Sequence, residues 1–80
     1  MTQSLSELAH EVIGGAIAVH RALGPGLLES TYKRCLELEL RARNLRFASE
    51  IEVPVVYRGV AIGTSYRLDL LIEDLIIVEV

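Results

Sequence analysis

Cysteine, long apolar runs and an excess of basic residues are scarce or missing in this sequence. Its 80 residues include one cysteine, Cys35, which excludes an internal disulfide and suits a reducing compartment. No run approaches the roughly 18 consecutive apolar residues that a membrane span requires. The first residues lack a basic segment followed by an apolar one, so we expect no signal peptide and a cytoplasmic protein that does not enter the membrane.

The net charge of −3 gives the chain no general affinity for nucleic acid, because non-specific nucleic-acid binders usually present a basic surface. Arg41, Arg43 and Arg46 do cluster, either as cations that complement a helix end or as contacts for a phosphate-bearing partner. The sequence also contains no glycine-rich phosphate loop, no Ser-His-Asp arrangement and no zinc-type Cys/His spacing. Composition therefore neither supports nor excludes a phosphate-bearing ligand.

Hydrophobic residues make up 51% of the chain, which predicts one folded domain over residues 1–80. Ser4 and Glu7 have the spacing of a capping box, and apolar residues recur at helical spacing from there to Leu23. Gly14-Gly15 in mid-helix indicates close approach by a neighbouring element, and Gly24-Pro25-Gly26 ends the helix. A second helix is predicted over residues 27–43, with Asn44 in the left-handed position after it.

Beyond Asn44 the apolar period changes to two, which predicts strands over residues 51–57, 66–72 and 76–80. Pro54 lacks an N–H donor and places the first strand at an edge or next to a bulge. Arg58-Gly59 is typical of a turn, and Gly63 marks a bend. The predicted fold class is α/β, with two N-terminal helices followed by an antiparallel three-stranded meander.

Three carboxylates are candidates for chemistry. Glu29 falls on the apolar stripe of the second helix, although an acid in a first turn can also simply face solvent and the positive helix end. Asp69 and Glu79 lie ten residues apart in an otherwise apolar run. A two-residue loop at Glu73-Asp74 would put these two acids on opposite faces of the sheet. A three-residue loop that includes Leu75 would place them directly opposite each other, with Cβ atoms about 5 Å apart, where a hard divalent cation relieves their repulsion.

The sequence resembles the GxxExxY protein family over essentially its whole length. The resemblance rests on a specific string that begins at His20 and on two later segments: His20-x-x-Leu23-Gly24-Pro25-Gly26-x-x-Glu29-x-x-Tyr32, Tyr66-Arg67-Leu68-Asp69-Leu70-Leu71 and Ile76-Ile77-Val78-Glu79. That family is grouped with the PD-(D/E)XK nuclease-like superfamily. The resemblance implies a mixed sheet flanked by helices and hydrolysis of nucleic-acid phosphodiesters with Mg²⁺ or Mn²⁺.

By position, the resemblance makes Glu29 the helix acid, Asp69 the strand acid and Glu79 the start of Glu-x-Lys, all three as catalytic and metal-binding residues. It implies that His20 and Tyr32 support the helix and the turn before it. It also implies a lysine directly after Val80, followed by a helix and a strand, so we expect a truncated, incomplete nuclease-like core that is weak or inactive as a nuclease. An exposed sheet edge or apolar face would then favour a homo-oligomer. The alternative function is a non-catalytic oligomerising or interaction module, and a smaller phosphate substrate also stays open.

Overall fold

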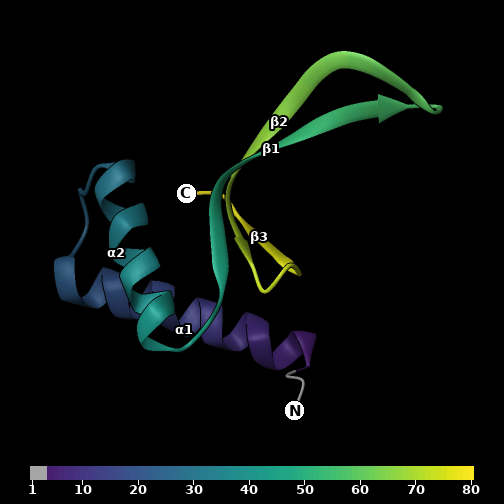
Figure 1. Ribbon diagram of the computed structural model, residues 1–80. Helices are drawn as coiled ribbons and strands as arrows, with labels where there is room; N and C mark the ends of the chain where they lie inside the picture. Colours follow the sequence, from purple (N-terminus) through teal and green to yellow (C-terminus); the bar gives the residue numbers. More distant parts are fainter. Residues whose placement is uncertain (1–3) are drawn as a thin grey trace. The chain divides into compact units, whose positions relative to one another are not determined.

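The computed structural model describes residues 4–80, and the first three residues of the predicted 1–80 domain lie outside that range. Two helices precede three strands, which confirms the predicted order and fold class (Figure 1). The elements are α1 (Leu5–Leu23), α2 (Glu29–Ala42), β1 (Phe47–Tyr57), β2 (Val60–Ile72) and β3 (Ile76–Val78). The chain divides into two compact units, one comprising the helices up to Arg46 together with Val80, the other spanning Phe47–Glu79. Each is described separately.

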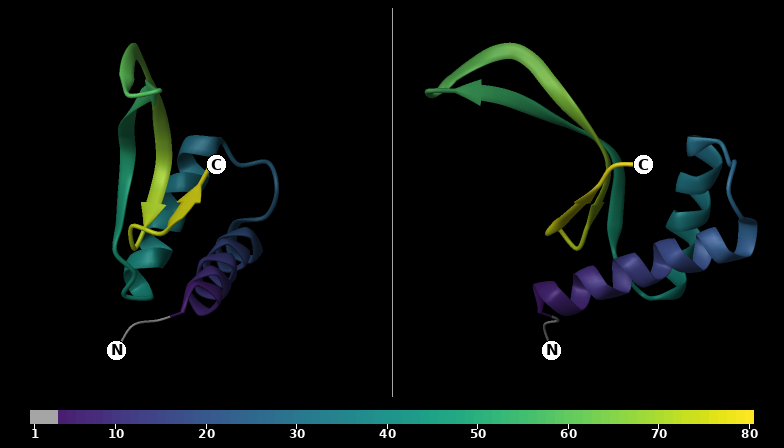
Figure 2. Two further views of the ribbon diagram at one scale, coloured as in Figure 1. Left: turned by 90° about the vertical axis from the view of Figure 1, so that its right-hand side faces the viewer. Right: turned by 180° about the vertical axis from the view of Figure 1, so that it is seen from behind.

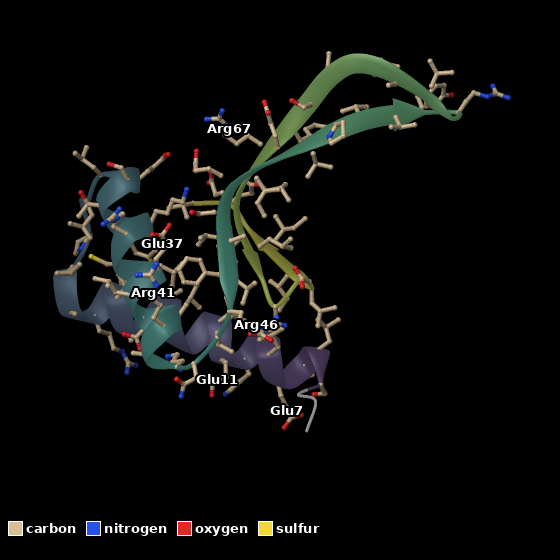
Figure 3. The ribbon with its side chains drawn as sticks, in the orientation of Figure 1. Glu7, Glu11, Glu37, Arg41, Arg46 and Arg67 are labelled. Carbon is tan, nitrogen blue, oxygen red and sulfur yellow. The ribbon has the colours of Figure 1, made fainter. Side chains whose placement is uncertain are left out.

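Helix α1 begins with the predicted capping box. The Glu7 backbone N–H donates to Ser4 Oγ at 3.1 Å, and the Ser4 backbone N–H donates to Glu7 Oε1 at 3.0 Å. The Ser4 backbone N–H lowers the pKa of the Glu7 carboxyl below its ordinary 4.5, and the Ser4 side-chain hydroxyl lowers it further. Glu7 therefore stabilises the first turn of α1 (Figure 3) chiefly as a carboxylate.

The two helices pack through apolar side chains at helical spacing. On α1 the buried positions follow one face, and on α2 Leu36 and Leu40 are almost completely buried. The buried α1 positions are Leu8, Val12, Gly15 and Val19. Among residues 4–80, no helix is both long and apolar enough to span a membrane.

The Gly14-Gly15 pair lies where α2 comes closest to α1, as the sequence predicted. A Cβ atom at position 14 would lie 3.1 Å from Arg43 Nη1, and one at position 15 would lie 3.3 Å from Glu39 Cγ. Over these glycines, Arg43 Nε donates to Glu39 Oε2 and its Nη1 donates to Glu11 Oε1, both at 2.9 Å. The bond to Glu39 and then that to Glu11 raise the pKa of Arg43, so its cation links the two helices.

Helix α2 is shorter than predicted at both ends. Leu28 is an extended N-cap residue, so the helix starts at Glu29 and not at Leu27. At the other end, the Leu45 N–H donates to the Leu40 carbonyl at 2.9 Å and the Asn44 N–H donates to the Arg41 carbonyl at 3.0 Å. With φ of 60° at Asn44 these bonds form a Schellman motif, which confirms the left-handed position predicted for Asn44.

The strands form a three-stranded antiparallel sheet in the order β1-β2-β3. β1 and β2 begin earlier than the alternation predicted, at Phe47 and Val60, and both end where it predicted. Together they run as one long curved ribbon (Figure 2). Tyr57 pairs with Val60 across a two-residue turn at Arg58-Gly59. The register shifts between Pro54 and Val56, where Gly63 lies in the opposite segment of β2, which confirms the predicted bulge. β3 ends at Val78, two residues before the predicted end.

The glycine crossing predicts a stability defect for Gly15→Leu. Gly15 is buried, and the added side chain would meet Glu39 Cγ and Arg43 Nε, so we expect unfolding free energy to fall by about 1–3 kcal/mol. Urea denaturation followed by circular dichroism measures the unfolding free energy of the variant and of the wild type. The matched control is Ala22→Leu, an exposed position on the same helix, which should change stability by no more than about 0.5 kcal/mol. Equal effects of the two substitutions would contradict the close approach.

The capping box predicts a pH dependence. Because the folded-state pKa of Glu7 is lowered, its contribution is present above the unfolded value of about 4.5 and is lost as pH falls through the folded pKa. Glu7→Gln keeps an acceptor that can complete the box but removes the titration. The difference in unfolding free energy between wild type and Glu7→Gln should therefore decline from pH 7 to pH 3. A difference that stays constant over this range would contradict the assignment.

Candidate metal-binding hairpin

The connection between β2 and β3 decides where the two strand acids lie. Ile72 pairs with Ile76, so the connection is the three-residue loop Glu73-Asp74-Leu75. The Leu75 N–H donates to the Ile72 carbonyl at 3.0 Å, and Glu73 and Asp74 both have φ above 50°. Two successive residues at positive φ match a type I′ turn, whose twist suits an antiparallel pair. Of the two loops left open by the sequence, the structure contains the three-residue one.

This register bears on whether Asp69 and Glu79 can share a face. The paired residues are Leu70 with Val78, Leu71 with Ile77 and Ile72 with Ile76, and the pairing ends there. If the same pairing continued one residue past the end of β3, Glu79 would lie opposite Asp69. Side chains alternate along each strand, so Asp69 lies on the face that carries Leu71 and Ile77, and Glu79 would share that face if the alternation of β3 continued one residue further. Leu70 and Ile72 lie on the other face and are completely buried. Directly opposed residues have Cβ atoms about 5 Å apart, close enough for two carboxylates to share one cation.

A third acid lies at the same level of the sheet and was not singled out from the sequence. Ser49 pairs with Leu70 and Ile51 pairs with Leu68, so Glu50 of β1 occupies the position across from Asp69. Its φ of 55° interrupts the ladder there, and its Oε1 lies 3.5 Å from Nη1 of Arg67 on β2. The period-two count could have placed Glu50 at this level, whereas its positive φ gives no signal in the sequence.

Glu29 belongs to the helical unit and lines a cavity there. It is the first residue of α2, it is exposed, and its N-cap residue Leu28 forms no side-chain capping bond. The cavity has a volume of about 420 Å³, and its walls come from the loop between the helices and the residues that flank it. They are His20, Gly24, Pro25, Gly26, Leu27, Glu29, Tyr32 and Val80. Glu29 thus has the solvent-facing, first-turn position that the sequence left as its alternative.

Tyr32 has a structural contact inside this unit. Its hydroxyl donates to the carbonyl of Ala16 at 2.9 Å and so ties α2 to α1. Gly24 and Gly26 have φ of 74° and 88°, conformations that side chains with a Cβ rarely adopt, which explains the glycines on either side of Pro25. These two features fit the supporting role that the resemblance implies for Tyr32 and for the turn that precedes Glu29.

The donor set at the hairpin suits a hard divalent cation. Within residues 4–80, no group of three or more His, Cys, Asp or Glu side chains gathers closely enough to hold a metal ion. The candidate donors on the hairpin are the two carboxylates of Asp69 and Glu79, and Glu29 is placed only within its own unit. Mg²⁺ is commonly held by one or two carboxylates, with water and substrate phosphate oxygens completing its shell. Asp69 and Glu79 fit that requirement.

The shared face of the two acids can be tested by cross-linking. In a Cys35→Ala background, Asp69→Cys combined with Glu79→Cys should form an intramolecular disulfide under mild oxidation, because directly opposed strand positions are close enough for one. The matched control combines Asp69→Cys with Val78→Cys, whose side chains point to opposite faces, and should stay reduced. Mass spectrometry after alkylation of the free thiols measures disulfide formation in both variants. A disulfide in the control alone would show that the register slips by one residue after Val78.

Comparison with known families agrees with this architecture. No curated protein and no solved structure matches the chain. The model of one family, described as the PD-(D/E)XK nuclease superfamily, matches residues 6–80. That match does not test the narrower GxxExxY family, which stays an expectation from the sequence. Because the matched region covers nearly all 80 residues, including both helices and all three strands, the chain belongs to the PD-(D/E)XK nuclease superfamily.

Proposed function

We propose that this chain is a metal-dependent nuclease-like domain that acts on phosphodiester bonds of nucleic acid. The observation that supports the proposal is the three-residue connection between β2 and β3, with Ile72 opposite Ile76. It is the loop length for which Asp69 and Glu79 would lie opposite each other on one face. Two neighbouring carboxylates repel each other unless a proton or cation lies between them. Membership of the nuclease superfamily adds the substrate class, and the metal is Mg²⁺ or Mn²⁺.

In this proposal Asp69 and Glu79 hold the metal through their carboxylate oxygens, and Glu29 contributes a third carboxylate from the start of α2. Asp69 is half-buried and Glu79 is exposed, so the hairpin fixes one ligand and leaves the other facing solvent and substrate. A divalent cation bound there would supply Lewis-acid activation of a phosphoryl oxygen and of the attacking water. Strand pairing orients Asp69 directly, and Glu79 directly follows Val78, the last paired residue of β3.

The alternative is a non-catalytic oligomerising or interaction module, in which the same acids are solvated surface residues. The net charge of −3 favours this alternative, since it opposes binding to a polyanion. The two roles differ in their response to metal, because the nuclease-like role requires a saturable site on Asp69 and Glu79. A cytoplasmic location belongs to both proposals.

Calorimetric titration of Mn²⁺ into the purified protein tests the site without requiring turnover. Asp69→Asn and Glu79→Gln should each weaken binding by about tenfold or more, because each removes one charged ligand of a two-carboxylate set. Glu29→Gln should weaken it as well if the helix acid contributes. The matched control is Asp74→Asn, which neutralises an exposed acid in the turn of the same hairpin and should leave the affinity unchanged.

Saturable binding that depends on both strand acids would justify cleavage assays on DNA and RNA with Mg²⁺ and Mn²⁺. Absent binding, or binding that neither Asp69→Asn nor Glu79→Gln alters, would overturn the metal site and leave the interaction module as the function. Equal losses in Asp74→Asn would show that the metal responds only to the total negative charge of the hairpin.

A further inference from the structure

The outer part of the β1–β2 ribbon carries an apolar face that is half-buried at its inner end, at Ile51 and Leu68, and exposed from Val53 and Tyr66 to the turn. We call this surface the arm face; it consists of Ile51, Val53, Tyr57, Val60, Ile62, Tyr66 and Leu68. Three cross-strand pairs define it, Ile51 with Leu68, Val53 with Tyr66 and Tyr57 with Val60, and Ile62 joins them by alternation from Val60. Not one of these side chains is charged. Within the unit Phe47–Glu79, these side chains give the ribbon a continuous apolar face.

The bulge near Pro54 does not break the continuity of this face. Between the pairs Pro54–Ser65 and Val56–Ala61, β1 has one intervening residue and β2 has three. β2 therefore has two more residues than β1 in this interval. Because two is an even number, both strands keep the same alternation of side chains on either side of the bulge. Tyr57 and Val60 near the turn consequently face the same way as Val53 and Tyr66 beyond the bulge.

Exposure of the arm face is large for so apolar a surface. Tyr66 is 67% exposed, Tyr57 66%, Val60 61%, Ile62 51% and Val53 40%. The opposite face of the same ribbon carries Glu52, Ser65 and Arg67, and Ser65 Oγ donates to Glu52 Oε1 at 3.4 Å. A two-stranded ribbon is only marginally stable alone in water, so an uncovered apolar face favours a partner.

We infer that the arm face is a self-association surface, on which the arm face of a second copy of this chain packs in a two-fold dimer. The exposed parts of the five side chains amount to roughly 500 Å² per copy, since one aromatic side chain contributes about 200 Å² when fully exposed. Two copies would bury about 1,000 Å², the lower limit for a specific interface and the range of concentration-dependent association. An uncharged face meets its own copy without burying an unpaired charge.

The face is favoured over the free strand edges as the contact. Pro54 removes a backbone donor from β1, and the bulge beside it interrupts the ladder, two features that oppose strand addition at an edge. Nucleic acid is disfavoured as the partner of this face. Single strands bind where aromatic side chains alternate with cations, but Arg67 lies on the opposite face and within 3.5 Å of Glu50.

This inference is independent of the metal proposal. Asp69 lies on the face opposite to Leu68 and Leu70, and Glu79 would share the face of Asp69, so arm-to-arm packing uses the surface that the acids do not occupy. Loss of metal binding therefore leaves the dimer standing, and loss of the dimer leaves the metal site standing.

Two valines of similar exposure provide the test. Val60 lies on the arm face and is 61% exposed, whereas Val56 pairs with Ala61 on the opposite face and is 58% exposed. Val60→Glu and Val56→Glu add the same charge near the same turn. Sedimentation equilibrium from ~10 μM to ~1 mM covers the concentrations at which an interface of this size associates.

The wild type and Val56→Glu should approach twice the monomer mass with rising concentration. Val60→Glu should associate about tenfold or more weakly, because each dimer would bury two unpaired carboxylates. A wild type that stays monomeric, or two variants that behave alike, overturns the arm-face dimer. Unchanged association in Val60→Glu together with weaker binding of a labelled DNA oligonucleotide overturns it too and assigns the face to nucleic acid. Circular dichroism of both variants confirms that they are folded.

Discussion

The pairing register of β2 with β3 is the constraint on which the functional reading of this chain depends. Strand side chains alternate strictly, so the number of residues in one turn determines which of them share a face. The loop Glu73-Asp74-Leu75 sets Ile72 opposite Ile76, and every pair beyond it follows. The same register places the buried Leu70 and Ile72 on one face and Asp69 on the other, and one more step of it would bring Glu79 to the face of Asp69. The length of this one turn thus determines which residues of β2 and β3 share the buried face and which share the face of Asp69.

Local patterns in the sequence were sufficient for the elements and for the features that close them. The capping box at Ser4 and Glu7, the left-handed Asn44 and the bulge opposite Pro54 each depend on residues within a few positions of one another, and each is confirmed. Glycine at positions 14 and 15 also predicted a close approach, although the sequence could not say that Arg43 supplies it. The partner comes from another helix, and no local rule identifies it.

The candidate site was predictable only in part. Alternation predicted Asp69 and Glu79 to be neighbours for only one of two possible loop lengths. The choice between the two lengths depends on the backbone conformation of Glu73 and Asp74, both of which have positive φ. The sequence gives no sign of it, since neither residue is glycine or asparagine. Glu50 was missed because it lies one residue before the predicted start of the first strand, whereas β1 begins at Phe47. The predicted role of Glu29 in the site depends on how segments far apart in the sequence lie in space, which hydrophobic periodicity does not predict. The helical ends were wrong by one to two residues, because fraying and extended caps depend on tertiary packing.

The even excess of residues at the β2 bulge has a consequence for how such chains diverge. Most surface loops accept insertions and deletions of any length. In this sheet, a single residue added between Ala61 and Ser65 or within Glu73-Asp74-Leu75 would exchange the faces of every position beyond it, whereas two added residues would leave the faces in place. Length variants that preserve both surfaces should therefore differ by even numbers at these two places, a parity rule that aligned relatives would display directly.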